Sequence, residues 1–408
     1  MLKSKIEVSL TDIRSAQKTL KKYLQPSPLL FNPWLSETFG CELYLKLENM
    51  QPIGSFKIRG ATYKISQLSA EERKKGVIAA SAGNHAQGVA WGSKQLGVKA
   101  LIVMPQNASL VKIQNTKALG AEVVLEGANY DEAYAHAQKL ARETKRVFIH
   151  AFEDASVIAG QGTVALEILE QISEVDFVIG SVGGGGLMSG ISLAFKELRP
   201  ETAVIGCQAE GAPSMIQSIK KGKAVRLDHA KTFADGIAVI QASEAMRKIL
   251  ASGLDSVLQA DDETIARAIL TLMEKAKVLA EGAGALPLAV LDQIEKRIRG
   301  KKVVLVISGG NIDVNLLSRI IDRGLIRAGR RLRVNVWVSD RPGSLARLTS
   351  LIAQMGVNIL QAIHDRSEPS THIDQTEVAF TLETRGPAHS QEVIKALKDQ
   401  VLRLDLVH

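Results

Sequence analysis

Residues 176–190 read Asp176-Phe-Val-Ile-Gly-Ser-Val-Gly-Gly-Gly-Gly-Leu-Met-Ser-Gly190, a stretch in which four consecutive glycines follow an apolar run. Its apolar first part, Asp176–Ser181, is typical of a buried strand, and the residues after the four glycines can begin a helix. Consecutive glycines expose backbone N–H groups, and the helix adds its positive N-terminal end. The stretch therefore predicts a phosphate site at a strand-to-helix junction, with a plain tight turn as the alternative. It matches neither a Walker loop nor the dinucleotide-binding spacing.

The same alternation of strand and helix extends outward, from residue 42 to residue 308. Helix-sized segments such as Asn84–Leu96 and Asp131–Arg142 separate runs rich in Val, Ile, Ala and Leu, as expected for strands covered on both faces. This order favours an α/β fold with parallel sheets, where ligands bind beyond the carboxyl ends of the strands. The expected strands are Glu42–Leu47, Val77–Ser81, Ala100–Met104, Glu122–Leu125, Val147–His150, Asp176–Ser181, Ala203–Gln208 and Lys302–Ser308.

The pattern changes near residue 330, after an Arg-rich stretch. An alternating strand, a turn at Asp340–Ser344 and an amphipathic helix capped by Gly356 follow one another. We therefore expect one domain over residues 1–328 and a separate α/β sandwich over residues 329–408. The elements expected in the second domain are the strands Leu332–Val338, Val357–Ile363 and Glu377–Thr384 and the helices Leu345–Met355 and Gln391–Leu402.

The composition is that of a soluble globular protein. Of 408 residues, 46% are hydrophobic and 23% charged, enough to bury a sizeable core in two or three domains. Only Cys41 and Cys207 occur, and Cys207 lies in an apolar run, which favours a buried, reduced thiol. The N-terminus resembles no targeting peptide, and no apolar window reaches the roughly 18 residues that span a bilayer. We expect a cytoplasmic protein that does not bind membranes.

The formal charge of +8 raises the question of a nucleic-acid partner. Arg319, Arg323 and Arg327 recur every four residues, as on the solvated face of a helix, and no aromatic interleaving accompanies them. Nucleic-acid binding is therefore not expected. The eight histidines are scattered without the spacing of zinc ligands, and no Gly-x-Ser-x-Gly motif occurs. Asp261 and Asp262 look like a helix start.

Lys57 lies in Gly54-Ser-Phe-Lys-Ile-Arg-Gly60. A lysine beside Ser55, Phe56 and two glycines fits an amine carried into a pocket, where desolvation lowers its pKa and frees the nucleophile. Taken alone, a surface lysine is the more common explanation. The other motifs in the sequence are what favour a lysine in a pocket over a surface lysine.

Two further motifs end expected strands. In Ser81-Ala-Gly-Asn-His-Ala-Gln-Gly88, free amides at a helix start can hold a second anion, such as a substrate carboxylate. Asn84 could donate to a phenolate oxygen, and His85 is either a general base or a structural histidine. Ser308 ends the run Val303–Ile307, and its hydroxyl can pair with a pyridine nitrogen, which leaves the ring a weaker electron sink than a carboxylate partner would.

Together and in this order, the four segments resemble the threonine dehydratase (threonine ammonia-lyase) family of fold type II pyridoxal-phosphate enzymes, from Pro26 to Asn311. The resemblance implies a tryptophan synthase β-like fold of two three-layer parallel-sheet subdomains, the smaller inserted at about 48–150. Residues 329–408 resemble an ACT domain, a ferredoxin-like α+β regulatory module that usually binds amino acids between copies. One copy is present, as in the medium-length form of these enzymes.

The resemblance also implies roles for individual residues, with pyridoxal 5′-phosphate as cofactor. Lys57 is the catalytic Schiff-base lysine, Phe56 lies against the ring, Asn84 binds the ring hydroxyl and Ser308 faces the ring nitrogen. Gly183, Gly184, Gly185 and Gly186 with Leu187 hold the phosphate. Ser81, Ala82, Gly83, Asn84 and His85 bind the substrate. The segments Thr232–Ala238 and Glu281–Ala285 resemble pocket walls.

Two departures from relatives narrow the expectation. Serine racemases of this fold carry a serine where this chain has Ala82, which argues against efficient racemisation. Relatives with a divalent cation site place an acid six residues after the counterpart of Glu210, where this chain has Ile216. No metal site is expected.

The expected reaction converts L-threonine to 2-oxobutanoate and ammonia, and L-serine to pyruvate, with a role in isoleucine biosynthesis. The substrate amine displaces Lys57, the freed lysine removes the α-proton, and the β-hydroxyl leaves with a proton from the cofactor phosphate. The alternatives are a serine dehydratase, a serine racemase or a non-catalytic amino-acid sensor. An amino-acid effector at the ACT domain and a homodimer or homotetramer are expected.

Overall fold

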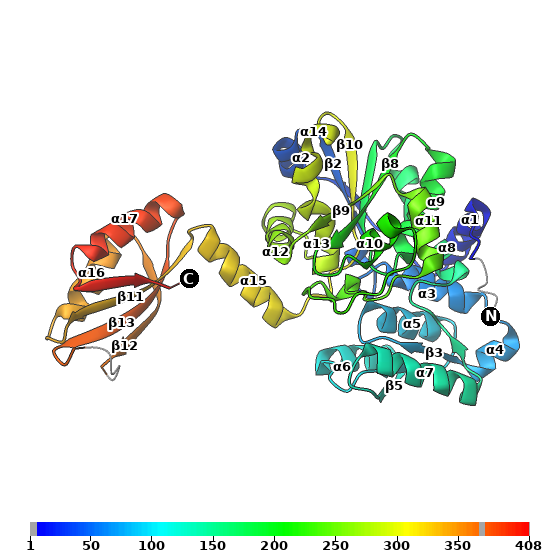
Figure 1. Cartoon of the computed structure of the whole chain (residues 1–408), viewed down its shortest axis with the longest axis horizontal. Coiled ribbons are helices and arrows are strands. Elements are labelled where there is room, and N and C mark those ends of the chain that lie inside the picture. The colour runs from blue at the N-terminus through cyan, green and yellow to red at the C-terminus, as the bar shows by residue number, and fades with distance from the viewer. Residues whose placement is uncertain (1–5, 367–371, 408) are drawn as a thin grey trace. The chain divides into compact units, whose positions relative to one another are not determined.

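The computed structural model describes residues 6–366 and 372–407 (Figure 1). The chain divides into two compact units, residues 1–312 and 313–408, each with its own core. The helix α15 (Val314–Arg327) falls in the second unit. The domain boundary that the change in sequence pattern predicted, between residues 328 and 329, lies after this helix and stays a prediction.

The first unit contains a six-stranded sheet in the order β1-β2-β10-β7-β8-β9. Neighbouring strands of this sheet are all parallel, except that β1 runs antiparallel to β2. Helix α13 packs against β10, β7 and β8, whereas α9 packs on β7 and β8 and contacts α8, whose residues share a core with the same sheet. The strands are β1 (Leu29–Phe31), β2 (Glu42–Leu47), β7 (Phe177–Ser181), β8 (Ala203–Ala209), β9 (Ser256–Ala260) and β10 (Lys302–Ile307).

A second, smaller sheet in the same unit is fully parallel, in the order β5-β4-β3-β6. Alternate residues of its central strands enter two different cores: Val77 and Ala79 pack with α5 and α3, whereas Ile78 and Ala80 pack with α7. This double burial explains why the strands are continuously apolar. The strands are β3 (Val77–Ala80), β4 (Ala100–Met104), β5 (Glu122–Leu125) and β6 (Val147–Phe148), all inside the range 48–150, whose bounds stay a prediction.

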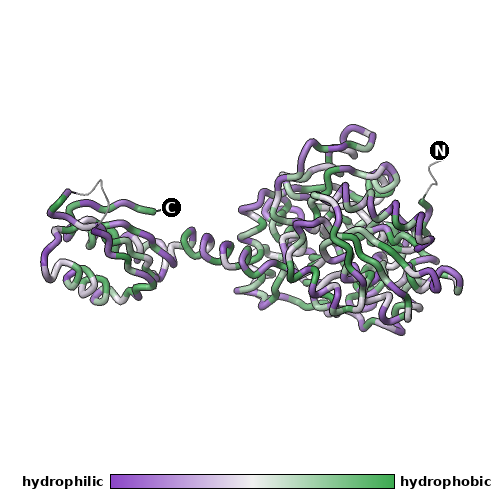
Figure 2. Tube along the Cα trace, turned by 90° about the horizontal axis from the view of Figure 1, so that it is seen from below, coloured by the Kyte–Doolittle hydropathy of each residue, from purple (hydrophilic) through white to green (hydrophobic). Residues whose placement is uncertain are grey.

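The helices of the first unit supply the outer layers. In Figure 2, hydrophobic stretches run through the middle of this unit, where the sheets lie. Asp261 caps the start of α12, as its sequence predicted, by accepting from the Thr264 N–H at 2.6 Å. The helices are α1 (Leu10–Leu20), α2 (Pro33–Phe39), α3 (Lys57–Ser66), α4 (Ala70–Lys75), α5 (Asn84–Gln95), α6 (Leu110–Ala118), α7 (Tyr130–Thr144), α8 (Ala155–Gln171), α9 (Gly186–Leu198), α10 (Ser214–Lys221), α11 (Glu244–Gly253), α12 (Asp262–Thr271), α13 (Gly282–Ala289) and α14 (Glu295–Ile298). Short turns complete them: η1 (Glu48–Met50), η2 (Asp235–Ile237), η3 (Leu272–Ala276) and η4 (Leu291–Ile294).

The eight strands predicted in this unit are all present, which confirms the α/β fold with parallel sheets. Two strands were not predicted, β1 and β9. Both lie at the edges of the six-stranded sheet, where a strand is covered on fewer sides and its sequence is less apolar.

After α15, the second unit forms an antiparallel sheet in the order β12-β13-β11-β14 with two further helices, the ferredoxin-like arrangement expected. The predicted helix Gln391–Leu402 is wrong at both ends, because Pro387 occupies the first turn of α17 and the chain leaves the helix after Lys398. Its elements are β11 (Arg331–Ser339), α16 (Ser344–Gln354), β12 (Asn358–Asp365), β13 (Gln375–Glu383), α17 (Pro387–Lys398) and the unpredicted β14 (Arg403–Leu406).

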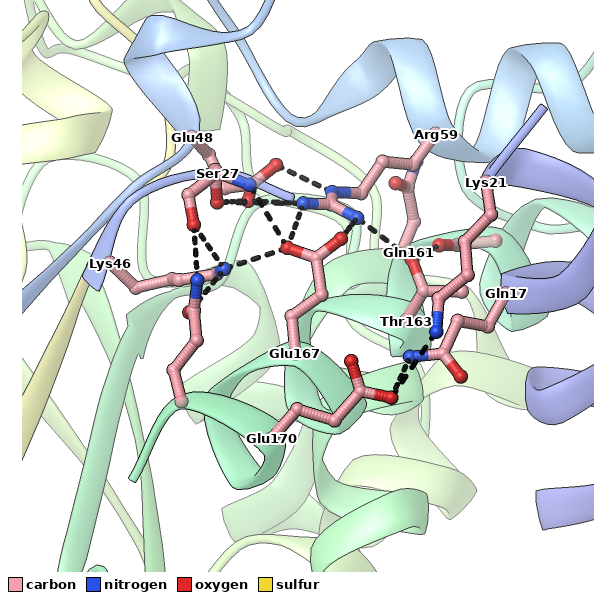
Figure 3. A network of polar contacts seen from close by, with 12 residues as sticks. Gln17, Lys21, Ser27, Lys46, Glu48, Arg59, Gln161, Thr163, Glu167 and Glu170 are labelled. Atoms are coloured by element: carbon pink, nitrogen blue, oxygen red, sulfur yellow. Dashed lines mark hydrogen bonds and ion pairs between the residues drawn. The ribbon is translucent and has the colours of Figure 1, made fainter. Parts of the chain in front are cut away.

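A buried ionic cluster ties the start of α3 to α8, β2 and η1 (Figure 3). Arg59, two residues after Lys57, donates to both oxygens of Glu48 at 2.7 Å and to both oxygens of Glu167 at 2.6 and 2.7 Å. Lys46 donates to Glu167 at 2.7 Å. At most 8% of any of these four side chains is exposed, and the two cations balance the two carboxylates.

Candidate active site

Three of the predicted motifs meet at the carboxyl ends of parallel strands. The glycine loop follows β7, Ser308 follows β10, and Ser81 follows β3. The Phe56 N–H donates to the carbonyl of Ser308 at 3.0 Å, and Ser55 forms a β-bridge with Gly309, so the lysine segment is fastened to the end of β10. The topology thus brings together the residues that the sequence singled out.

Lys57 is the first residue of α3. Its amine donates to the carbonyl of Ala151 at 3.0 Å and lies 5.2 Å from the centre of the Phe56 ring. Burial lowers the pKa of Lys57 to about 8, against the opposing charge of Glu281. The amine is therefore easily obtained in its neutral, nucleophilic form near neutral pH.

The glycine loop ends at α9, whose first turn has no side-chain cap. Gly185 has φ 97°, which favours glycine, and a β-carbon on it would lie 2.9 Å from Leu250. A β-carbon on Gly183 would lie 3.1 Å from Ile237, and one on Gly184 2.2 Å from the Phe152 ring. The loop therefore presents backbone N–H groups rather than side chains, as an anion site requires.

Replacing Gly184 by alanine should weaken cofactor binding. The new β-carbon overlaps the Phe152 ring, and relieving that overlap shifts the loop amides. A cost of about 1–3 kcal/mol corresponds to a cofactor dissociation constant raised about 10- to 100-fold. Fluorescence titration of the cofactor-free protein measures it. Gly222→Ala, at φ 67° with open space around it, is the control and should leave the constant unchanged.

The predicted carboxylate site lies at the start of α5. Asn84 is its first residue, and no side chain caps the helix. The Gly83 N–H donates to the Ser81 hydroxyl at 3.1 Å, which fixes the loop before it. Ser81, Ala82, Gly83 and Asn84 are all partly exposed, as residues that contact a substrate must be.

The side chain of His85 fits the second of the two alternatives that the sequence left open, a structural histidine. Its side chain is buried, and Nε2 donates to the carbonyl of Ile149 at 2.9 Å. Burial, helped by the charge of Lys57, lowers the pKa of His85 to about 3. The ring stays neutral, with its Nε2 proton committed to the backbone, and cannot act through that nitrogen as a base.

Glu281 and Asn311 join Asn84 in a polar cluster. Asn84 Nδ2 donates to Glu281 Oε1 at 2.7 Å, and Asn311 Nδ2 donates to Asn84 Oδ1 at 2.8 Å. Burial, with the charge of Asp235, raises the pKa of Glu281 to about 7. The sequence placed Glu281 in a pocket wall but did not reveal that it is buried and titrates near neutral pH.

Glu281 should contribute a loss of stability to the cofactor-free protein as the pH rises from about 4.5 to about 7, against the gain that the lowered pKa of His85 gives below pH 6.5. The folded protein keeps a proton on Glu281 that the unfolded chain releases around its ordinary pKa of 4.5. The contribution of Glu281 is therefore complete below pH 4.5 and lost as the pH rises through 7, and it amounts to about 3 kcal/mol. Urea unfolding of the parent and of Glu281→Gln between pH 4 and 8 measures it, since the difference in stability between the two proteins should change by this amount over the range.

Pyridoxal phosphate fits this set of residues. The site offers an amine with a lowered pKa, a glycine loop with uncapped amides, and Ser308, whose side chain is 3% exposed, at the end of β10. Among the residues that the structure describes, none is a hydrogen-bond partner of the buried Ser55 hydroxyl, which lies beside the bridge to Gly309, as expected where a ligand completes the site.

The sequence missed two contacts that the structure reveals. The carbonyl of Ala151 accepts a hydrogen bond from the Lys57 amine, and Phe152 packs on Gly184. These consecutive residues connect the amine to the glycine loop. A backbone acceptor and a single phenylalanine form no recognisable motif, so neither contact could be predicted from the sequence. The wall segments lie where expected, with Ile237 against Gly183.

Within the described residues, no group of three or more His, Cys, Asp and Glu side chains is placed to hold a metal ion. Ile216, at the position where an acid would be required, is buried.

Comparison with known proteins gives two family matches. Residues 20–309 match the family described as "Pyridoxal-phosphate dependent enzyme", and residues 332–401 match the ACT domain. The first match covers most of the catalytic motifs, and the second covers the core of the second unit.

Similar proteins extend over nearly the whole chain. The L-threonine ammonia-lyase of Thermotoga maritima is 48% identical over 96% of this chain and 97% of its own length, and that of Geobacter sulfurreducens is 44% identical over 95% and 96%. Threonine deaminase isoform 2 of Solanum lycopersicum is 37% identical with a TM-score of 0.74 over 77% of this chain and 86% of that one. Maize serine racemase is 33% identical with a TM-score of 0.74 over 78% and 98%. The chain belongs to the threonine ammonia-lyase (threonine dehydratase) family of pyridoxal-phosphate-dependent enzymes and carries an ACT domain.

Proposed function

We propose that this lyase converts L-threonine to 2-oxobutanoate and ammonia, and L-serine to pyruvate and ammonia. The observation that carries the proposal is the position of the Lys57 amine, whose pKa is lowered. The amine donates to the carbonyl of Ala151, and the next residue, Phe152, packs on the glycine loop. The near-complete relatives named L-threonine ammonia-lyase support threonine as the substrate. A non-catalytic sensor would need none of these features.

Each residue of the site has a separate task in holding the cofactor and substrate. The amides of Gly183 to Gly186 and Leu187 would bind the phosphate group, Phe56 would lie along the ring, and Ser308 would donate to the ring nitrogen. Uncapped amides at Asn84 and His85, with the Ser81 loop, would bind the substrate carboxylate. When bound, pyridoxal phosphate supplies an electron sink that makes the hydrogen on the substrate α-carbon acidic.

Lys57 has the second task of moving the proton. With cofactor and substrate bound, the Lys57 amine would act as the base, and its lowered pKa would let it accept the α-proton near neutral pH. The β-hydroxyl of the substrate leaves as water. A serine hydroxyl at position 308 cannot stabilise a positive ring nitrogen as a carboxylate would, which favours rapid β-elimination over a long-lived carbanion.

Serine racemisation is the second candidate, since racemases share this fold at 33% identity. A racemase needs an acid or base on both faces of the α-carbon. The position expected to supply it on the second face is Ala82, which has no proton to give. The Nε2 atom of His85 does not supply the missing acid or base, because it is hydrogen-bonded to the Ile149 carbonyl.

The second unit implies control by an amino acid. The ACT match supports an amino-acid effector, and a homodimer or homotetramer, because such domains bind effectors between copies. The medium-length arrangement and a place in isoleucine biosynthesis make isoleucine the first effector to test.

Among the described residues, no helix is both long and apolar enough to cross a membrane.

Formation of 2-oxobutanoate from L-threonine tests the proposal. The ratio kcat/KM for L-threonine should exceed that for L-serine, and D-serine should not accumulate from L-serine. The same assay with added isoleucine tests the effector, with valine and L-alanine as comparisons. Racemic serine, or no 2-oxo acid from either substrate, would rule the proposed reaction out.

A further inference from the structure

The orientation of the Asn84 amide is held from both ends. Its Nδ2 donates to Glu281 Oε1 at 2.7 Å, and its Oδ1 accepts from Asn311 Nδ2 at 2.8 Å. Turning the amide over would set its oxygen against the Glu281 oxygen and its nitrogen against the Asn311 nitrogen. Both contacts would then be lost, so one orientation is strongly preferred.

Both partners of Asn84 are themselves fixed. Glu281 is 6% exposed, and its backbone N–H donates to the Gly309 carbonyl at 3.0 Å. Asn311 Nδ2 also donates to the Ile53 carbonyl at 2.7 Å. The cluster therefore joins four segments that lie far apart in sequence, from the lysine segment to the end of β10.

Two glycines leave room for this cluster. A β-carbon on Gly309 would lie 2.3 Å from Glu281 Oε1, and one on Gly54 would lie 2.5 Å from Asn311 Oδ1. Neither distance is tolerable for real atoms. Glycines at these positions are thus needed for the two side chains that hold Asn84.

We propose that Glu281 is a positioning residue for cofactor binding: it fixes the Asn84 amide so that one Asn84 N–H remains for the ring oxygen of pyridoxal phosphate. An amide nitrogen carries two hydrogens, and Glu281 takes only one of them. The charged groups facing Glu281 are Asp235 on η2, Lys112 on α6 and Lys57 on α3, and Lys112 already pairs with Asp235 at 2.6 Å. The role rests on the proposed function, since it assumes that Asn84 contacts the cofactor.

A double-mutant cycle separates positioning from ordinary stabilisation. The dissociation constant of pyridoxal phosphate is measured by titrating the cofactor into the cofactor-free protein, for Glu281→Ala, Asn84→Ala and the double variant. Loss of one hydrogen bond of about 1.4 kcal/mol should raise the constant about 10-fold in each single variant. If Glu281 acts through Asn84, the double variant should also be about 10-fold weaker, not 100-fold. Additive effects, or no effect of Glu281→Ala, would overturn the proposal.

Glu281→Gln covers the case in which Glu281→Ala does not fold. Glutamine keeps the shape and an oxygen that can accept from Asn84, so the dissociation constant should stay within about 3-fold of the parent value. The parent protein should show a change in cofactor absorption between pH 6 and 8, where Glu281 loses its proton, and Glu281→Gln should not. A loss of 10-fold or more, or an unchanged pH profile, would contradict the role assigned to Glu281.

Glu201→Gln is the matched control. Glu201 is an exposed carboxylate on the turn before β8, at the end of the sheet away from the site, and its variant should keep the parent constant and pH profile. Because the readout is cofactor binding, it does not depend on which amino acid the enzyme uses. If the double-mutant cycle shows coupling between Glu281 and Asn84 but the enzyme does not turn over threonine, the proposed substrate is wrong and the role of Glu281 is still supported.

Discussion

Lys57→Ala should produce no measurable 2-oxobutanoate from L-threonine. The substitution removes both the amine that attaches the cofactor and the base that takes the α-proton, so kcat/KM should fall by about 10⁴-fold or more. The purified variant should also lack the visible absorption of covalently attached cofactor. Both readouts come from the same protein sample, by spectrum and by 2-oxo acid assay.

A lysine on the same helix provides the control. Lys64 lies two turns further along α3 and pairs with Asp154 at 2.7 Å near the surface. The pair is partly buried, with 23% and 19% of the two side chains exposed, so Lys64→Ala should lose some stability, but the folded variant should keep its absorption and activity within about 3-fold. Full activity in Lys57→Ala would end the assignment of the catalytic lysine, and equal losses in both variants would show that α3 itself had been disrupted.

Three of the four motifs directly follow a strand, whereas Lys57 begins a helix. A glycine run after an apolar strand, or a serine at the end of one, has its place set by the topology of a parallel sheet. Gly183, Ser308 and Ser81 therefore lie beyond the carboxyl ends of β7, β10 and β3. The same local signals predicted the eight strands of the first unit.

Contacts between distant segments could not be predicted in this way. The acidity of Glu281 depends on burial, on Asp235 and on Asn84, and none of these is near it in sequence. The neutral state of His85 depends on its burial in the folded chain and on the charge of Lys57, and neither is visible in the residues next to it in sequence. Edge strands such as β1 and the end of α17 were missed because their sequences carry weak patterns and their limits are set by neighbours.

Arg59→Met should destabilise the first unit more than any surface substitution. Arg59 is 1% exposed and makes paired hydrogen bonds to two carboxylates, Glu48 and Glu167. Burial alone would lower its pKa, yet the two carboxylates raise it above its ordinary value, so it stays charged. Methionine fills similar space but leaves Glu48 with no cation, at a cost of about 3–5 kcal/mol. Urea unfolding followed by tryptophan fluorescence and circular dichroism measures the loss.

The cause of that loss can be isolated by removing the stranded charge. In Arg59→Met/Glu48→Gln the buried carboxylate is gone, while Lys46 still balances Glu167 at 2.7 Å, so part of the stability should return. Arg199→Met, which breaks a surface pair 3.9 Å long, is the control and should cost less than about 1 kcal/mol. Because Arg59 lies two residues from Lys57, Arg59→Met should also weaken cofactor binding, whereas Arg199→Met should not. A double variant as unstable as Arg59→Met would place the loss in packing and not in charge.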